Sequence, residues 1–413
     1  MRGAPFRFAE APLYWWAIPD IRWPPARSFR EMFMNAPFSD LPEFSIGKPV
    51  RRSEDPALVQ GRGRYSDDEA LPGQAFGAVV RSRHAHGRIR GIDTTAAKAM
   101  PGVVAIYTAA DLGAYHPQKS PFPLKSVDGT PLRANGTAFF ARDKVRFVGD
   151  PIALVVAESE IEAREAAEAV DVSIEALPAV VDPREACAPG APLVYDDVPE
   201  NTAVNHALGD REKVAEAFAK AKWIARLNIA NNRLIVAAME PRAALFDYDP
   251  ATERFTALMQ SQGAFGMRNN LAAAMGVSND KMRVITNQVG GSFGMKGSVF
   301  PEYIALLHAT RELKRPIKWS EQRTESFVSD HHGRDHDIDA ELALDAEGHF
   351  LALRMNGYGN LGAYLTAFGV LIAAVNIHRN AQSVYRTPLI ETNVRCVVTN
   401  TPPVGAYRGA GRP

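Results

Sequence analysis

Residues 288–296, which read QVGGSFGMK, are the part of the sequence that most constrains the fold. They follow an apolar run at 282–286 that is typical of a strand, and they precede a predicted helix at 300–310. Glycine lets the backbone adopt positive φ, and a run of free N–H groups at such a turn can hold phosphates or metal-bound oxygens. The stretch matches neither GxGxxG nor the P-loop pattern, and a plain glycine-rich turn is the alternative.

Two other segments carry side chains suited to a similar ligand. Gln262 follows a predicted strand at 254–259, and strand ends are common ligand positions in α/β folds. Its amide can donate to an oxo group. Arg408 lies in GAYRGAGRP, 405–413, where small residues flank an aromatic ring and a planar guanidinium that suits a flat, anionic ligand. The alternatives are a surface glutamine and a turn beside a strand at 393–398.

Other polar residues favour structural roles or leave the choice open. The segment 331–337, HHGRDHD, is dense in His and Asp, but it leads into an alternating strand, so we expect a solvated loop rather than a metal site. Glu240, in the segment MEPR, is either a buried carboxylate or half of a salt bridge at a strand edge. Cys187 and Cys396 have no histidine near them in the sequence and are expected to be structural.

Composition excludes several classes of protein. The chain has 413 residues, which favours two or three domains, and its 47 basic and 47 acidic residues give a formal net charge of zero. This balance argues against binding to nucleic acid or to an acidic membrane surface through bulk charge. Two cysteines are too few for a disulfide framework or an iron–sulfur cluster. No apolar run suits a membrane span and no secretory signal is recognisable, so the cytoplasm is the expected location.

The order of apolar patterns predicts an α+β chain with four parts. These are an irregular extension at 1–45, an α/β domain at 46–185, a linker at 186–210 that lacks apolar periodicity, and a second α/β domain at 211–413. Strands are predicted at 75–83, 103–107, 145–148, 152–157, 170–177, 223–230, 243–248, 254–259, 282–286, 317–319 and 393–398, helices at 94–99, 159–169, 211–222, 265–275 and 300–310, and a β-hairpin at 337–344 and 350–358.

Taken in order, these segments resemble the large, molybdopterin-binding subunit of the xanthine dehydrogenase, aldehyde oxidase and aerobic carbon monoxide dehydrogenase family. GKPVRRSEDPALVQGRGRYSDD at 47–68 resembles the segment with which the family's fold opens. The resemblance continues through HAHGRIRGIDTTAAKAMPGVVAIYTAADL, VRFVGDPIALVVA, MEPR, SQGAFGMR, VGGSFGMK, NLGAY and GAYRGAGRP. It implies an α/β hammerhead domain followed by the first part of a molybdopterin-binding domain.

The resemblance also implies a cofactor and a set of residues around it. The family hydroxylates a substrate carbon with water at a molybdenum centre, which a pterin holds and no protein side chain ligates. By resemblance, Gln262 and the backbone of Phe293 address the molybdenum oxygens, Gly291 and Gly294 shape the loop, and Arg408 lies near the metal. The family's cofactor is molybdenum–molybdopterin, with a cytosine dinucleotide form among its variants.

Partner subunits follow from the same resemblance. The family passes electrons to 2Fe-2S clusters in an iron–sulfur small subunit and to FAD in a medium subunit, and a full-length large subunit implies a dimer of heterotrimers. The family's general base is a Glu in a GxGE segment near the end of a longer chain. That Glu is expected beyond position 413, so we expect a truncated or split subunit that is inactive alone. An inactive remnant with at most a partner-binding role is the alternative, and a stand-alone sugar or nucleotide binder is less favoured.

Departures from the family pattern narrow the substrate. Gly409 stands where carbon monoxide dehydrogenases carry a copper-binding Cys, and Gly297 lies near where purine-oxidising relatives carry a carboxylate. Ser292 replaces a usual Gly, and Asn360 a usual Asp. An aldehyde or an N-heterocycle is therefore the expected substrate class. We also expect the second domain to expose apolar surface, which would lower its solubility.

Overall fold

The computed structural model describes residues 52–113, 115–116, 120–133 and 139–411. The chain divides into two compact units, 1–62 and 63–413. The described part of the first unit contains one short helix, α2 (Asp55–Leu58). The extension predicted at 1–45 lies outside the described residues.

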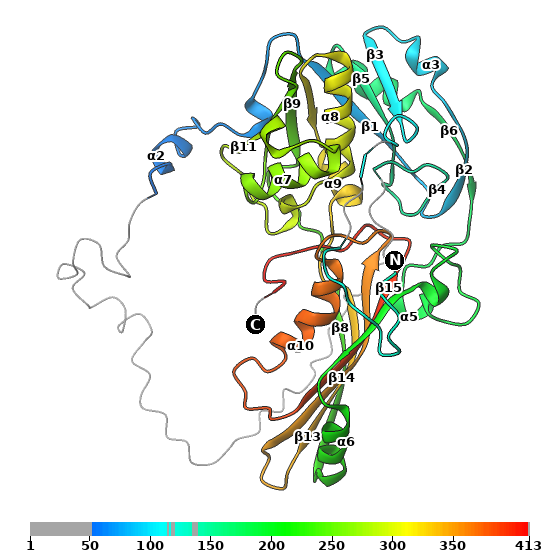
Figure 1. The fold of residues 1–413 in the computed structure, drawn as a ribbon, viewed down its shortest axis with the longest axis vertical. Coiled ribbons are helices and arrows are strands. Elements are labelled where there is room, and N and C mark those ends of the chain that lie inside the picture. The colour runs from blue at the N-terminus through cyan, green and yellow to red at the C-terminus, as the bar shows by residue number, and fades with distance from the viewer. Residues whose placement is uncertain (1–51, 114, 117–119, 134–138, 412–413) are drawn as a thin grey trace, which may run out of the picture. The chain divides into compact units, whose positions relative to one another are not determined.

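The larger sheet of the second unit has seven strands in the order β11-β10-β9-β12-β1-β5-β3 (Figure 1). β1 and β12 are parallel, with Ala75 opposite Ile317, whereas β5 is antiparallel to β1 and to β3. This one sheet therefore contains strands from both predicted α/β domains. The strands are β1 (Ala75–Arg81), β3 (Val103–Thr108), β5 (Pro151–Ala157), β9 (Ala243–Asp249), β10 (Arg254–Met259), β11 (Met282–Ile285) and β12 (Ile317–Ser320).

Helices pack on both faces of this sheet. Successive residues of a strand point to opposite faces, so neighbouring residues of β1 contact different helices. On β1, a Cβ built at Gly77 would lie 2.8 Å from Leu306 in α8 (Pro301–Leu313), whereas Ala78 packs with Ala163 in α4 (Glu160–Glu168). The hydroxyl of Ser159 accepts from the Glu162 N–H and so caps α4. A third long helix, α7 (Ala264–Met275), connects β10 to the chain that leads into β11.

A small sheet has the order β4-β2-β6, formed by β4 (Lys144–Val145), β2 (Gly87–Asp93) and β6 (Asp171–Ala176). β2 was not predicted from the sequence, because its arginines and glycines obscure the alternation of apolar and polar residues. Other short helices are η2 (Ser66–Asp68), α3 (Thr95–Lys98), α5 (Pro183–Ala186), η4 (Asn279–Lys281), η5 (Met295–Gly297), α9 (Arg323–Ser329), η6 (Leu371–Val375) and α10 (Asn376–Asn380).

A five-stranded sheet has the order β7-β15-β14-β13-β8. The predicted hairpin is present as β13 and β14, and the predicted helix at 211–222 is α6, which packs Val214 and Phe218 against this sheet. The bounds are β7 (Thr202–Leu208), α6 (Arg211–Lys220), β8 (Trp223–Asn231), β13 (His336–Leu344), β14 (Phe350–Gly362) and β15 (Ile390–Val398).

The segment 186–210 is folded, which corrects its prediction as a linker. It contains η3 (Pro199–Asn201) and β7, an edge strand of the five-stranded sheet. Asn201 is fully buried; its side chain accepts from the Val194 N–H at 2.8 Å and donates to the carbonyls of Ala186 and Pro192 at 2.9 Å. Side-chain-to-backbone hydrogen bonds hold the segment together with buried apolar residues such as Val194, Val198 and Val204, whose spacing is irregular.

The edge strand β8 leaves apolar side chains uncovered, in line with the expected exposed surface. Trp223, Leu227 and Ile229 lie on one face of β8 and are 60%, 65% and 41% exposed. Among the described residues, no helix is both long and apolar enough to cross a membrane.

Candidate functional site

The glycine-rich stretch and the terminal segment meet at one cleft of about 830 Å³. Its wall combines residues that lie far apart in the sequence, from the regions near positions 65, 238, 291 and 407. The residues that line it are Tyr65, Val236, Ala237, Met239, Glu240, Gly290, Gly291, Phe293, Tyr407 and Arg408. Three of the five residues predicted for a site, Gly291, Phe293 and Arg408, therefore share a single cleft.

The glycine-rich loop has a backbone that few residues other than glycine adopt. Gly291 and Gly294 have φ of 103° and 106°, and Phe293 between them has φ of 50°. A Cβ at Gly294 would lie 2.6 Å from the Ala406 carbonyl oxygen, so glycine is needed for the close approach of the two loops. The Arg408 N–H donates to the Phe293 carbonyl at 2.7 Å, which joins the loops directly.

Backbone donors of the glycine-rich loop remain without acceptors. The N–H groups of Gly291, Ser292 and Phe293 make no hydrogen bond to any described residue. Free, consecutive N–H groups form an electropositive concavity that suits anionic oxygens. The loop therefore has the free N–H groups that its glycine-rich sequence predicted.

Gln262 is bound to this loop and has a fixed orientation. Its Oε1 accepts from the Gly294 N–H and from the Ser292 hydroxyl, both at 2.7 Å. A backbone N–H can only donate, so the amide oxygen must face the loop and the NH₂ group must face away from it. The Nε2 donor has no acceptor among the described residues.

Glu240 and Lys296 fasten the two ends of the loop. Glu240 Oε2 accepts from the Gly290 N–H at 2.6 Å and from Lys296 Nζ at 3.1 Å, and Lys296 also donates to the Glu240 carbonyl at 2.8 Å. The Lys296 side chain is fully buried, and this burial lowers its pKa. Glu240 is therefore a mostly buried carboxylate inside an ion pair. Lys296 was not predicted from the sequence as the partner of Glu240.

A second buried cation, Arg242, follows Glu240 by two positions in the chain. Arg242 has no exposed surface and contacts Glu321 at 2.6 Å, Asp330 at 2.7 Å and Glu302 at 3.3 Å. Burial raises the pKa of Asp330 to about 6, against the lowering effect of Arg242. Sequence reasoning missed this network, because its members are about 60 to 90 residues from Arg242 in the chain.

The histidine-rich segment 331–337 is buried, which corrects its prediction as a solvated loop. His331, His332 and His336 are 5%, 6% and 8% exposed, and burial lowers their pKa values to about 3, about 4 and about 4. They are neutral near pH 7 and do not form a cluster; among the described residues, the close group of metal-ligand types is Asp345 with Glu347 and His349, at the turn of the hairpin.

The segment 331–337 is buried because it packs under the chain at 403–407. His332 N–H donates to the Pro403 carbonyl, and the Gly405 N–H donates to the His332 carbonyl. A Cβ at Gly333 would lie 2.4 Å from the Cβ of Tyr407. The sequence pattern of 331–337 shows none of these contacts, which depend on tertiary structure.

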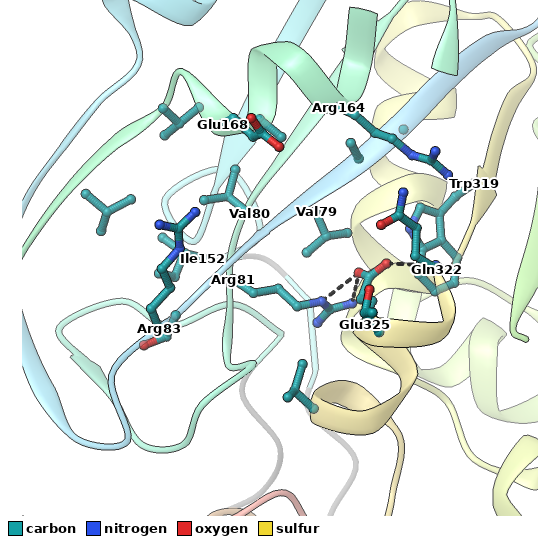
Figure 2. Close-up of a pocket in the computed structure, with 18 of the residues that line it drawn as sticks. Val79, Val80, Arg81, Arg83, Ile152, Arg164, Glu168, Trp319, Gln322 and Glu325 are labelled. Carbon is teal, nitrogen blue, oxygen red and sulfur yellow. Dashed lines mark hydrogen bonds and ion pairs between the residues drawn. The ribbon is translucent and has the colours of Figure 1, made fainter. Parts of the chain in front are cut away.

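A second cavity, of about 620 Å³, lies between β1, α4, β12 and α9 (Figure 2). Figure 2 shows Arg81 reaching the carboxylate of Glu325, at 2.6 Å, and Arg81 also bonds Glu302 at 2.5 Å. The buried charges of this cavity are thus satisfied within the protein, and none of the predicted site residues lines it. The cleft between the two loops is therefore the candidate site.

Comparisons with known proteins match both parts of the chain to described families. Residues 194–413 match the family described as "Molybdopterin cofactor-binding domain", and residues 60–178 match "Aldehyde oxidase and xanthine dehydrogenase, a/b hammerhead domain". The chain is 34% identical to the nicotine 6-hydroxylase large subunit of Paenarthrobacter nicotinovorans, over 89% of this chain and 44% of that protein.

Two further relatives differ in how much of them this chain covers. The chain is 26% identical to the nicotinate dehydrogenase large molybdopterin subunit of Eubacterium barkeri, over 89% of this chain and 82% of that subunit. It superposes on quinoline 2-oxidoreductase from Pseudomonas putida 86 with a TM-score of 0.82 and 30% identity, over 89% of this chain and 46% of that one. The chain thus spans about half the length of the most similar curated relatives.

Proposed function

Because this chain belongs to the molybdopterin-binding large-subunit family of xanthine dehydrogenase, aldehyde oxidase and carbon monoxide dehydrogenase, we propose that its cleft holds one side of a molybdenum–molybdopterin cofactor. The observation that carries the proposal is the convergence of unsatisfied donors at one cleft. The N–H groups of 291–293 and the Arg408 guanidinium are free donors of the two loops that line the cleft, and the carboxylate that lines it, Glu240, is paired with Lys296. The Gln262 amide is bound to the same loop but does not line the cleft.

The residues present fit such a group. An oxyanionic cofactor needs donors rather than acceptors, and the free N–H groups of 291–293 supply them. The glycines at 290, 291 and 294 keep this loop in place, because a Cβ there would meet Glu240, Phe293 and Ala406. When bound, the cofactor supplies the redox chemistry of the reaction. The Nε2 of Gln262 and the N–H of Phe293 would donate to its anionic oxygens, Gly291 and Gly294 would keep the loop open, and Arg408 would balance negative charge.

The proposed reaction is hydroxylation of a carbon in an aldehyde or an N-heterocycle. A C–H bond becomes C–OH with oxygen from water, and two electrons and two protons are released. N-heterocycles are favoured, because relatives are named for nicotine, nicotinate and quinoline. Gly409 cannot bind copper as a thiolate would, which disfavours carbon monoxide as substrate.

Partners complete the proposed enzyme. Electrons would pass to a 2Fe-2S small subunit and an FAD medium subunit, in a dimer of heterotrimers in the cytoplasm, with the cofactor in its plain or cytosine dinucleotide form. The general-base Glu would come from the part of the family subunit that this chain does not match, on the same or on a second polypeptide. The nicotinate dehydrogenase large molybdopterin subunit is comparable in length to this chain, which supports a Glu supplied by a second polypeptide.

The experiment is expression of the full chain in a host that makes the molybdenum cofactor, followed by metal analysis and pterin fluorescence of the purified protein. We expect molybdenum and pterin in equal amounts, and no heterocycle-dependent dye reduction until the matching partners are added. A chain without molybdenum would contradict cofactor binding and favour the inactive remnant. Dye reduction by the chain alone would contradict the assignment of the base to another segment.

A further inference from the structure

Two side chains hold the carbonyl groups of the terminal loop, defined here as residues 405–411. Arg334 donates from Nη1 to the Tyr407 carbonyl at 2.8 Å and from Nη2 to the Arg408 carbonyl at 2.7 Å. Asn376 donates from Nδ2 to the Ala410 carbonyl at 2.7 Å. These three acceptors are therefore turned toward the body of the protein and are already occupied.

Some donors of the same loop are left free, although the N–H groups of Gly405 and Arg408 are bonded. The N–H groups of Gly409 and Ala410 make no hydrogen bond to any described residue. The Arg408 guanidinium likewise has no hydrogen-bond acceptor among them, and it lies over the Phe293 ring with 5.6 Å between its carbon and the ring centroid. The loop thus presents two N–H groups and a guanidinium as free donors, while its carbonyls at 407, 408 and 410 are engaged by Arg334 and Asn376.

The segment that carries Arg334 is strained, and several contacts maintain that strain. Arg334 and Asp335 have φ of 68° and 72°, a left-handed backbone that is unfavourable for residues other than glycine. Asp335 pairs with Arg233 at 2.7 Å, and the Arg334 guanidinium lies 5.1 Å from the centre of the Tyr407 ring. Strain of this kind persists where surrounding structure enforces it, and it commonly marks a functional site.

We propose that Arg334 and Asn376 are positioning residues that hold the carbonyls at 407, 408 and 410 away, so that the free donors of the terminal loop can bind an oxyanion. The inference rests on the proposed function, and it names residues that do not line the cleft themselves. The oxyanion is either the oxygen-bearing metal group of the cofactor or one of its phosphates, because both need the same donors. Arg334 acts through its bidentate grip on two consecutive carbonyls, which a lysine cannot reproduce.

The test measures anion binding at the loop with the full chain. Orthomolybdate and inorganic pyrophosphate are titrated separately, and hydrogen exchange is followed in peptides that cover the terminal loop. Arg334→Ala, Arg334→Lys and Asn376→Ala are compared with wild type. Arg354→Ala is the matched control, because Arg354 also makes two hydrogen bonds, to Glu341, but lies on β14 away from the cleft.

We expect one or both anions to slow exchange of the loop in wild type and in the control. Arg334→Ala should weaken this protection roughly tenfold, Arg334→Lys should not restore it, and methylguanidinium should restore it in Arg334→Ala. Protection by molybdate alone indicates the metal group, and protection by pyrophosphate indicates a phosphate. Equal protection in wild type and Arg334→Ala, or no protection in wild type, overturns the inference. The molybdenum content of wild type is measured separately and tests the proposed function independently of Arg334.

Discussion

The backbone N–H of Arg408 donates to the carbonyl oxygen of Phe293 at 2.7 Å, although the two residues lie 115 positions apart. This bond joins the terminal loop to the glycine-rich loop at the cleft. Because Phe293 has a left-handed backbone and Gly294 follows with φ of 106°, the bond fixes the loop in a geometry that its sequence permits but does not enforce. The arrangement of both loops can be tested by single substitutions.

Gly294→Ala should open the junction of the two loops. The new Cβ would lie 2.6 Å from the Ala406 carbonyl and would need an unfavourable φ, so we expect a loss of about 2–4 kcal/mol in stability and a loss of bound molybdenum. Gly276→Ala is the control, since Gly276 also has positive φ but has nothing within 4 Å of a Cβ. Thermal unfolding and metal analysis of both variants are the measurements; equal effects would argue against a close contact of the loops.

Gln262→Glu should separate the structural role of the amide from its role in binding. A carboxylate can still accept from Gly294 and Ser292, so the melting temperature should change little. The variant replaces the free NH₂ donor with an acceptor that repels an oxyanion, so molybdenum content should fall at least tenfold. Retention of the metal by Gln262→Glu would remove Gln262 from the cofactor site.

Lys296→Met should destabilise the loop by leaving Glu240 charged and unpaired in a mostly buried position. The expected cost is about 3–5 kcal/mol, measured by denaturant unfolding. The double variant with Glu240→Gln should recover part of that loss, because the uncompensated charge is gone. Strictly additive losses would mean that the two side chains do not act as a pair.

Asp150 should make stability depend on pH. Burial raises its pKa to about 7, while its carboxylate accepts from the Arg146 N–H and the Tyr364 hydroxyl. A carboxyl group whose pKa rises on folding stabilises the fold when protonated, and this contribution is lost as pH increases from about 4 through about 7. Between pH 5 and pH 8, the stability of Asp150→Asn relative to wild type should therefore rise by about 2–3 kcal/mol. A pH-independent difference in denaturant unfolding would contradict the shift.

Much of the fold could be predicted from local patterns. The strand at 152–157, the capped helix at 159–169 and the hairpin at 337–344 and 350–358 are present within a few residues of their predicted bounds, because each has one clear periodicity. The resemblance to molybdenum hydroxylase large subunits and the α+β class are confirmed. The division into domains stays a prediction, and one sheet holds strands from both proposed domains.

The errors arise where polar residues are buried. The buried apolar residues around Asn201 are irregularly spaced and Asn201 itself makes three hydrogen bonds, so the segment resembles a linker in sequence. The histidines at 331, 332 and 336 look solvated, but the terminal loop packs over their segment. The roles of Lys296 and Arg334 were not predicted, because they depend on partners that only the tertiary structure brings near. Burial of polar groups follows from such long-range packing rather than from local periodicity.

The most direct test of the account compares the two cavities. The full chain and its variants are expressed in a host that makes the molybdenum cofactor, and molybdenum per chain is measured in wild type, in Gln262→Glu and in Arg83→Ala, which alters the cavity of Figure 2. We predict that wild type and Arg83→Ala carry the metal equally and that Gln262→Glu has lost it. Metal loss in Arg83→Ala with retention in Gln262→Glu would place the cofactor elsewhere and contradict the central claim.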